Sequence, residues 1–310
     1  MIHPRTIASG LRFPEGPIAM PDGTLVVVEI ERGTLTRIAA DGTLSVIAEP
    51  GGGPNGAAIG PDGRCYVCNN GGFAWHAESG GPGLRPVGQA ANYSGGRIEA
   101  VDLATGAVET LYTDCDGHPL KGPNDIVFDG TGGFYFTDLG KVRPRDWDRT
   151  GLYYARTDGS EIRQVAFPLI TPNGIGLSPD ESVLYAAETA TGRLWGFDIE
   201  EPGRIKKHPF PSPHGGRLIG NSTGFRNFDS LAVEAGGAIC VATLMDGGIT
   251  VFAPDGNSIE HVPMPDPYYV TNICFGGPEL RTAFITQSWL GTVIAVDWPR
   301  PGLALNFLNK

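Results

Sequence analysis

The sequence predicts an all-β fold, a six-bladed β-propeller with four-stranded antiparallel blades, and its internal repeats carry this prediction. One hairpin pattern occurs six times: a small polar cluster, an apolar strand, a turn at Gly or Pro, and a second apolar strand. The polar residues that open these copies are 40, 69, 49, 56 and 43 residues apart. Periods of roughly 40 to 50 residues are typical of propeller blades. The six entrance residues are Glu15, Asn55, Asn124, Asn173, Asp229 and Asn272.

The composition agrees with a propeller. The 310 residues include 46 Gly and 26 Pro, as expected where many short strands are joined by tight turns. Hydrophobic residues make up 41% of the chain, which is enough for a sizeable core. The repeat runs along the whole chain without a linker, so we expect residues 1–310 to form a single domain.

The first blade shows how the ring should close. Residues 4–12 resemble the outer strands that precede other entrance residues, but they have no earlier blade to join. The segments before Glu15 and after Asn272 add up to about one repeat. We therefore expect strands from both termini to close the ring, which removes exposed sheet edges. Leu303–Phe307 is a second candidate for the outer strand of the last blade, and the sequence leaves open which terminus supplies it.

The second blade contains an insertion, because the spacing between Asn55 and Asn124 is too long for one repeat. The inserted segment, residues 70–97, is rich in Gly and carries Phe73, Trp75 and Tyr93. Long loops in compact domains are often functional, and aromatic residues argue against disorder. This segment is interpreted either as a lid over the channel mouth or as a loop packed on the neighbouring blade.

The third copy places His118 and Lys121 just ahead of Asn124 and Asp125. Asp138 ends the second strand of this copy and is interpreted as a strand-end residue.

The remaining copies hold two weaker assignments. Residues 208–225, between the fourth and fifth copies, are interpreted as a long connection. Three histidines have no partners at metal-binding spacing and are interpreted as surface residues: His208, His214 and His261.

Charge and targeting signals narrow the class of protein. A formal net charge of −11 argues against a nucleic-acid partner, which needs a basic surface. The N-terminus lacks the apolar region of a secretion signal, and no run approaches the roughly 18 apolar residues of a membrane helix. The five cysteines do not resemble a disulfide framework, so we expect buried thiols. These features predict a cytoplasmic protein without a membrane partner, whose oligomeric state stays open.

The entrance residues predict a metal site. Each propeller blade places its innermost strand along the central channel, so residues far apart in sequence should form one ring at one end. The ring would hold two carboxylates, Glu15 and Asp229, and four Asn amides. Oxygen donors without Cys or His suit a hard divalent cation. Two like-charged carboxylates without a counter-ion would repel each other. This argues against the alternative that the ring is only a set of hydrogen-bonded polar side chains closing the channel.

The motifs around these residues are similar to those of the senescence-marker/gluconolactonase/luciferin-regenerating-enzyme family of six-bladed propellers, over essentially the whole chain. The similarity rests on FPEGP at Glu15, GPNDIVFD and YFTD around Asn124, TPNGIGLSPD at Asn173 and FDSLAVE at Asp229. It implies a hydrolase that opens lactone rings, with Glu15, Asn173 and Asp229 as metal ligands and Asn124 contacting metal or substrate. It also implies one divalent ion, with Ca as the first expectation and Zn, Mn, Mg or Fe(II) as alternatives.

The implied mechanism is metal-activated attack of water on the lactone. A bound metal would polarise the carbonyl, and a carboxylate would take a proton from water. Asp229 is the first candidate for this base and Asp125 the second.

The substrate of that reaction is predicted to be a lactone less polar than a sugar lactone. Sugar lactonases of the family often carry Arg two residues before the Asn that matches Asn124, and this chain has Gly122 there. This departure and the aromatic insertion favour a less polar lactone. Residues expected at the substrate are Asn124, Asn55, Asn272, Lys121, His118, Phe73, Trp75 and Tyr93.

Two alternatives to lactone hydrolysis stay open. The same metal site could hydrolyse a phosphotriester or another ester. A propeller could also be a non-catalytic scaffold, which would hold no metal stoichiometrically.

Overall fold

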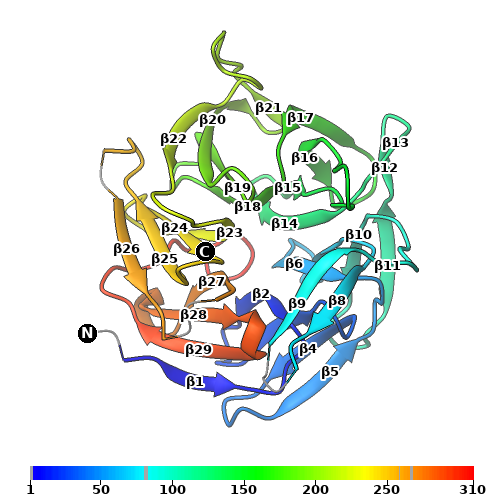
Figure 1. The fold of residues 1–310 in the computed structure, drawn as a ribbon, viewed down its shortest axis with the longest axis vertical. Helices are drawn as coiled ribbons and strands as arrows, with labels where there is room; N and C mark the ends of the chain where they lie inside the picture. The colour runs from blue at the N-terminus through cyan, green and yellow to red at the C-terminus, as the bar shows by residue number, and fades with distance from the viewer. Residues whose placement is uncertain (1–2, 80–82, 258, 266–267) are drawn as a thin grey trace.

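The computed structural model describes residues 3–79, 83–257, 259–265 and 268–310, and it contains the predicted six-bladed β-propeller. Six four-stranded antiparallel sheets surround a central axis (Figure 1). The innermost strands, one per blade, are β2 (Pro14–Ala19), β6 (Pro54–Ile59), β14 (Pro123–Phe128), β18 (Pro172–Leu177), β23 (Phe228–Val233) and β27 (Val270–Gly276).

The other strands follow outward in each blade. The second strands are β3 (Leu25–Glu29), β7 (Cys65–Asn69), β15 (Gly133–Asp138), β19 (Val183–Glu188), β24 (Ile239–Thr243) and β28 (Thr282–Gln287). The third strands are β4 (Thr34–Ile38), β10 (Arg97–Val101), β16 (Thr150–Arg156), β20 (Arg193–Glu201), β25 (Gly248–Phe252) and β29 (Thr292–Asp297). The outer strands are β5 (Leu44–Ala48), β11 (Val108–Tyr112), β17 (Ile162–Leu169), β22 (Arg217–Asn221), β26 (Ile259–Pro263) and β1 (Arg5–Ala8).

Short elements lie outside this pattern. A separate hairpin is formed by β8 (Phe73–Ala77) and β9 (Leu84–Gln89), and a smaller one by β12 (Asp114–Cys115) and β13 (His118–Pro119). The short strand β21 (Arg204–Ile205) pairs with β20. Two single-turn 3-10 helices, η1 (Pro278–Leu280) and η2 (Ser288–Leu290), lie in the last blade. Within the described part of the chain, no helix has the length and apolar character needed to cross a membrane.

The ring closes through the N-terminal strand. β1 pairs antiparallel with β29, so the first residues of the chain complete the blade built from its last repeat. The other candidate, Leu303–Phe307, forms no strand, and its residues 303–306 instead line the central channel. The two ends of the chain therefore both contribute to closure, as the repeat arithmetic predicted.

Two local assignments from the sequence were wrong. The segment interpreted as a connection, residues 208–225, contains β22, which is the outer strand of the fourth blade. His214 is not at the surface: it is 6% exposed, and its ring packs edge-on against Trp195 with centroids 4.5 Å apart. The expectation for the cysteines is confirmed, since all five are buried free thiols.

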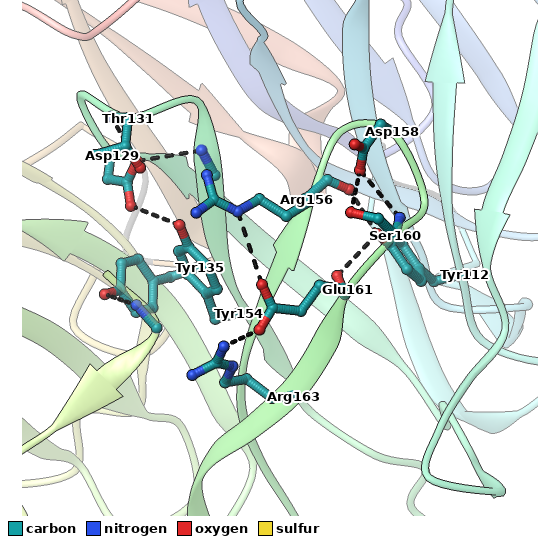
Figure 2. A network of polar contacts seen from close by, with 12 residues as sticks. Tyr112, Asp129, Thr131, Tyr135, Tyr154, Arg156, Asp158, Ser160, Glu161 and Arg163 are labelled. Carbon is teal, nitrogen blue, oxygen red and sulfur yellow. Dashed lines mark hydrogen bonds and ion pairs between the residues drawn. The ribbon is translucent and has the colours of Figure 1, made fainter. Parts of the chain in front are cut away.

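The hydrophobic core lies between neighbouring blades. One cluster joins Val127 and Tyr135 of the third blade to Ile175 and Leu184 of the fourth. Polar contacts likewise fasten the second blade to the third at their edges (Figure 2). The Tyr112 hydroxyl of β11 donates to the carbonyl oxygen of Arg156 at 2.6 Å. The propeller is therefore held by side chains that cross from blade to blade, since strand pairing occurs within blades.

The C-terminal segment closes one end of the channel. Beneath the inner strands lies a cavity of about 120 Å³, lined by apolar side chains and by residues 303–306, 308 and 310. The Asn306 amide donates to the carbonyl oxygen of Phe128, at the end of β14 opposite to Asn124. Phe307 packs against the Phe128 ring with centroids 6.0 Å apart. The C-terminal segment therefore covers the channel at the end remote from Asn124.

Deleting residues 303–310 should lower the free energy of unfolding by roughly 2–4 kcal/mol, because apolar channel walls would meet water. Urea denaturation and the binding of a hydrophobic dye would measure this. Asn306→Ala is the matched control, which removes polar contacts to Phe128 and Glu181 but keeps the apolar ones. It should cost about 1 kcal/mol. If the deletion lowers the free energy of unfolding no more than this control does, residues 303–310 are not held in the channel by apolar contacts.

Candidate active site

The entrance residues are re-aimed by a β-bulge in every inner strand. In each blade the register between the innermost and second strands shifts at the entrance residue or directly beside it. A bulge bends the strand locally and changes the direction of a side chain. The six copies of the sequence motif therefore encode one backbone irregularity, repeated six times around the axis.

Glycines after the entrance residues let neighbouring blades approach closely. A Cβ atom on Gly16 would lie 2.6 Å from the carbonyl oxygen of Asn55, which is too close for any other residue. Gly56 meets the backbone of Asn124 and Asp125 in the same way, and Gly174 meets the backbone of the Asp229 strand. Each inner strand thus contacts the entrance of the next.

The ring residues are buried. Exposed fractions lie between 2% and 9% for the entrance residues and for Asp125, which follows Asn124. Those entrance residues are Glu15, Asn55, Asn124, Asn173, Asp229 and Asn272. Asp125 and Asn272 also line the top of the channel cavity.

Hydrogen bonds fix the orientation of the ring side chains. The Asn272 amide donates to Glu15 Oε2 at 2.7 Å, and the backbone N–H of Gly16 donates to the same oxygen at 2.9 Å. The Asn173 amide donates to Thr189 Oγ1 at 3.0 Å, which turns the carbonyl oxygen of Asn173 away from Thr189. The Asn272 carbonyl oxygen accepts from the backbone N–H of Ile273 at 2.8 Å, whereas that of Asn173 accepts only a long bond from Ser230 Oγ at 3.5 Å.

Three carboxylates share this buried region, and burial raises the pKa of each. Burial raises the pKa of Asp125 to about 7, and the negative charge of Glu15 adds to the rise. Burial likewise raises the pKa of Glu15, against hydrogen bonds from Asn272 and Gly16. The pKa of Asp229 lies well above its ordinary value because of burial and then repulsion from Glu15. A cation at the ring would relieve both the desolvation and the repulsion.

The donor set fits a hard divalent cation. The Asn124 Oδ1 atom is buried and has no hydrogen-bond partner, although a buried carbonyl oxygen normally has one. Within the described residues, no three His, Cys, Asp or Glu side chains are close enough to hold a metal by themselves. A cation here would therefore depend on amide oxygens as well as carboxylates, a mixture that suits calcium.

Residues at the ends of the second strands hold the entrance loops. Asp138 accepts hydrogen bonds from the backbone N–H groups of Lys121 and Gly122, both at 2.7 Å. Glu29 does the same for Arg12 in the first blade, and Glu188 for Ile170 in the fourth. The interpretation of Asp138 as a strand-end residue is thus confirmed.

The insertion forms the β8–β9 hairpin, which packs beside the ring. Trp75 contacts Phe13, two residues before Glu15, with ring centroids 5.1 Å apart. Phe73 contacts Trp75 edge-on at 6.1 Å. The hairpin also touches the third blade, where the backbone N–H of Gln89 donates to the Val142 carbonyl oxygen.

Three other residues expected at the substrate have contacts outside the ring or are exposed. The Tyr93 hydroxyl donates to the backbone carbonyl oxygen of Lys121 at 2.6 Å, so Tyr93 supports the entrance loop. The Lys121 side chain is half-buried, and its positive charge contributes to the lowered pKa of Asp148. His118 is exposed on β13. Their roles at a substrate stay predictions.

Sequence reasoning missed Lys141, a buried lysine that fastens the hairpin. Its ammonium group donates to Asn70 Oδ1 at 2.9 Å and to the Gly72 carbonyl oxygen at 3.1 Å. It also lies 4.0 Å from the centre of the Phe73 ring and 5.3 Å from that of Tyr93. Its partners are about 70 residues away in sequence, so no local pattern signalled them.

Fold and site together define a class: a six-bladed propeller with buried carboxylates and amides gathered at one end of its channel. Residues 13–288 match the SMP-30/Gluconolactonase/LRE-like region, and the chain belongs to this family.

Individual relatives are distant. The chain is 24% identical to a gluconolactonase of Zymomonas mobilis, over 91% of this chain and 78% of the relative. It is 29% identical to the diisopropyl-fluorophosphatase of Loligo vulgaris, over 63% of each chain. Its fold is similar to a crystal structure of regucalcin, a calcium-binding protein from Agrobacterium tumefaciens. The TM-score is 0.72 at 19% identity, and the match covers 98% of each chain.

Lys141 gives a pH-dependent prediction for stability. Burial lowers its pKa to about 7, against attraction from Asp138 and then Asp148. Between pH 7 and about 10 the unfolded chain would bind more protons at Lys141 than the folded chain. The contribution of Lys141 to the free energy of unfolding should therefore become more favourable as pH rises. As pH rises, the free energy of unfolding of wild type should therefore increase relative to that of Lys141→Met, by up to about 1.4 kcal/mol per pH unit.

Urea denaturation at pH 6, 7, 8 and 9 would measure this difference. Lys206→Met, at an exposed position, is the control and should show a flat difference. A flat difference for Lys141→Met as well would mean that its ammonium group is not desolvated.

Proposed function

We propose that this protein hydrolyses lactones with a divalent cation bound at the channel ring. The observation that carries the proposal is the unpaired Asn124 Oδ1 atom beside three buried, mutually repelling carboxylates. Membership in the family and the similarity to a gluconolactonase support the choice of a lactone as substrate.

The residues that would hold the cation are Glu15, Asn124, Asn173 and Asp229. A bound divalent ion supplies a Lewis acid, which polarises a carbonyl and stabilises developing negative charge. Calcium is the first candidate, because the donors are all oxygens and include neutral amides. The calcium-binding regucalcin, which has the same fold, supports this choice.

The remaining chemistry belongs to the chain's own side chains. Asp229 would accept a proton from the attacking water and return one to the alkoxide that leaves when the ring opens. Its raised pKa makes it a stronger base when ionised. Asp125 is the second candidate, with a pKa of about 7, near the ideal for a group that must both accept and donate. Glu15 is held in place by Asn272 and Gly16.

A second candidate function is the hydrolysis of phosphotriesters at the same ring. The identity of 29% to a diisopropyl-fluorophosphatase favours it. A panel of lactones and phosphotriesters, each assayed with Ca, Mg, Mn, Zn or Fe(II) after metal removal, separates the two. Purified protein that holds no metal and turns over neither class would be a non-catalytic scaffold, and the proposal would fail.

Asp229→Asn tests the base. The amide keeps the shape of the side chain but cannot accept the proton, so we expect kcat to fall by about 100- to 10,000-fold. Circular dichroism and metal content should show a folded protein, and Asp125→Asn is the matched comparison. Wild-type turnover by Asp229→Asn with metal bound would exclude Asp229 as the base.

Glu15→Gln tests the cation site without an activity assay. A ligand that binds only the folded state stabilises it by about 2.7 kcal/mol at 100 times its Kd. Addition of calcium to metal-free wild type should raise Tm, and the rise should shrink in Glu15→Gln. Glu31→Gln, on the surface and paired with Arg12, is the control and should keep the full rise. A wild-type Tm that does not respond to any divalent ion would remove the proposed site.

A further inference from the structure

An aromatic cluster borders the ring, and it extends beyond the insertion. From the first blade and the hairpin come Phe13 and Trp75, with ring centroids 5.1 Å apart. From the last blade come Tyr269 and Trp289, which stack with centroids 5.7 Å apart and planes 12° from parallel. Tyr269 joins the two halves, because its ring meets Phe13 edge-on at 5.9 Å.

The hairpin and the last blade also touch directly. At the start of β9, a Cβ atom added to Gly83 would run into the indole ring of Trp289. The inserted hairpin therefore reaches from the second blade to the last one, and only glycine permits this contact.

Two members of the cluster have strained backbones. Phe13 has φ 57° and Tyr269 has φ 51°, in the left-handed region that aromatic residues rarely adopt. Thr171, which directly precedes the inner strand of the fourth blade, has the same conformation with φ 47°, so the strain belongs to the blade entrances and persists because the surrounding structure fixes it. The backbone of Tyr269 is held by hydrogen bonds to the Leu244 carbonyl oxygen at 2.7 Å and from the Ser288 N–H at 3.0 Å.

These two residues directly precede inner strands of the ring. Phe13 precedes β2, which carries Glu15, and Tyr269 precedes β27, which carries Asn272. The Tyr269 phenol also lies within electrostatic range of Asp229, whose charge adds to the effect of burial in raising the phenol pKa. The cluster is thus adjacent to the ring carboxylates.

The exposed faces of the cluster are flat and largely apolar. Trp75, Tyr269 and Trp289 are partly exposed, while Phe13 is buried behind them. The hairpin cation Arg85 lies beside Glu78, with Nε and Oε1 3.6 Å apart, and its charge also opposes the rise that burial causes in the pKa of the Tyr269 phenol. Flat aromatic faces favour stacking with planar apolar groups, whereas a polyhydroxylated ring would need polar partners for its hydroxyls.

We propose that Trp75, Tyr269 and Trp289, supported by Phe13, form a substrate subsite for a planar apolar group attached to or fused with the scissile lactone. The inference rests on the proposed function for the reacting bond, but the subsite itself can be tested by binding. It assigns substrate selectivity to two blade-six residues together with the hairpin. It also identifies the substrate class as aryl-substituted or aryl-fused lactones.

Kinetics with two lactones of the same ring size test the subsite. Dihydrocoumarin is a δ-lactone fused to benzene, and δ-valerolactone lacks the aromatic ring. In Tyr269→Leu and in Trp289→Leu, kcat/KM for dihydrocoumarin should fall at least about 10-fold more than kcat/KM for δ-valerolactone. Phe210→Leu, at a side chain 94% exposed, is the control and should change neither value.

A binding measurement separates this inference from the proposed function. 2-Tetralone has the shape of dihydrocoumarin but carries CH2 in place of the ring oxygen, so it cannot be hydrolysed as a lactone. Calorimetry should show that wild type binds it and that both variants bind it at least about 10-fold more weakly. Such binding without any lactone hydrolysis would keep the subsite and overturn the proposed function. Equal losses on both lactones, or equal 2-tetralone affinity in wild type and variants, would overturn the subsite.

Discussion

The structure depends on one electrostatic constraint, the burial of three carboxylates from three blades at one end of a channel. Each blade alone would expose its entrance residue to water. Closing the ring removes that water and brings Glu15, Asp125 and Asp229 within range of one another, as their raised pKa values show. Folding therefore builds a region that costs free energy unless protons or a cation occupy it. A propeller without chemistry would have no reason to retain this cost.

The fold could be predicted from the sequence because the same sequence pattern recurs in every blade. Six copies of one hairpin fixed the number of blades, and the repeat arithmetic required both termini to close the ring. The bulge at each entrance residue accounts for the polar residue in an otherwise apolar strand, and glycines such as Gly16 and Gly56 follow because the next blade's backbone lies against them. The outer strand β22 was missed because it has only two large apolar residues, Leu218 and Ile219, and directly follows a run rich in Pro and Gly.

Only the part of the candidate site that repeats in every blade, the entrance residues, could be predicted from the sequence. The sequence placed the six entrance residues in one ring, and the structure brings them together. Lys141, Tyr269 and Trp289 were missed because their contacts join segments about 70 to more than 200 residues apart, and no periodicity records such pairs. The aromatics of the insertion signalled a wall near the channel. They could not reveal that blade six supplies its other half, since that depends on the left-handed backbone at Tyr269.

The two ends of the channel differ in polarity and in what covers them, and this difference places the proposed chemistry at one end. At one end the C-terminal segment covers apolar walls; at the other, oxygen donors meet partly exposed aromatic rings. In the proposed function, protons and a cation would compete for the same oxygens, because a carboxylate that binds metal must be deprotonated. Burial raises the pKa of Glu15, one of the proposed ligands, to about 7, so this competition would fall at neutral pH. The burial that makes the ring costly in its ionised state would thus also favour the binding of a cation, and it would keep the carboxylates basic enough to accept a proton from water.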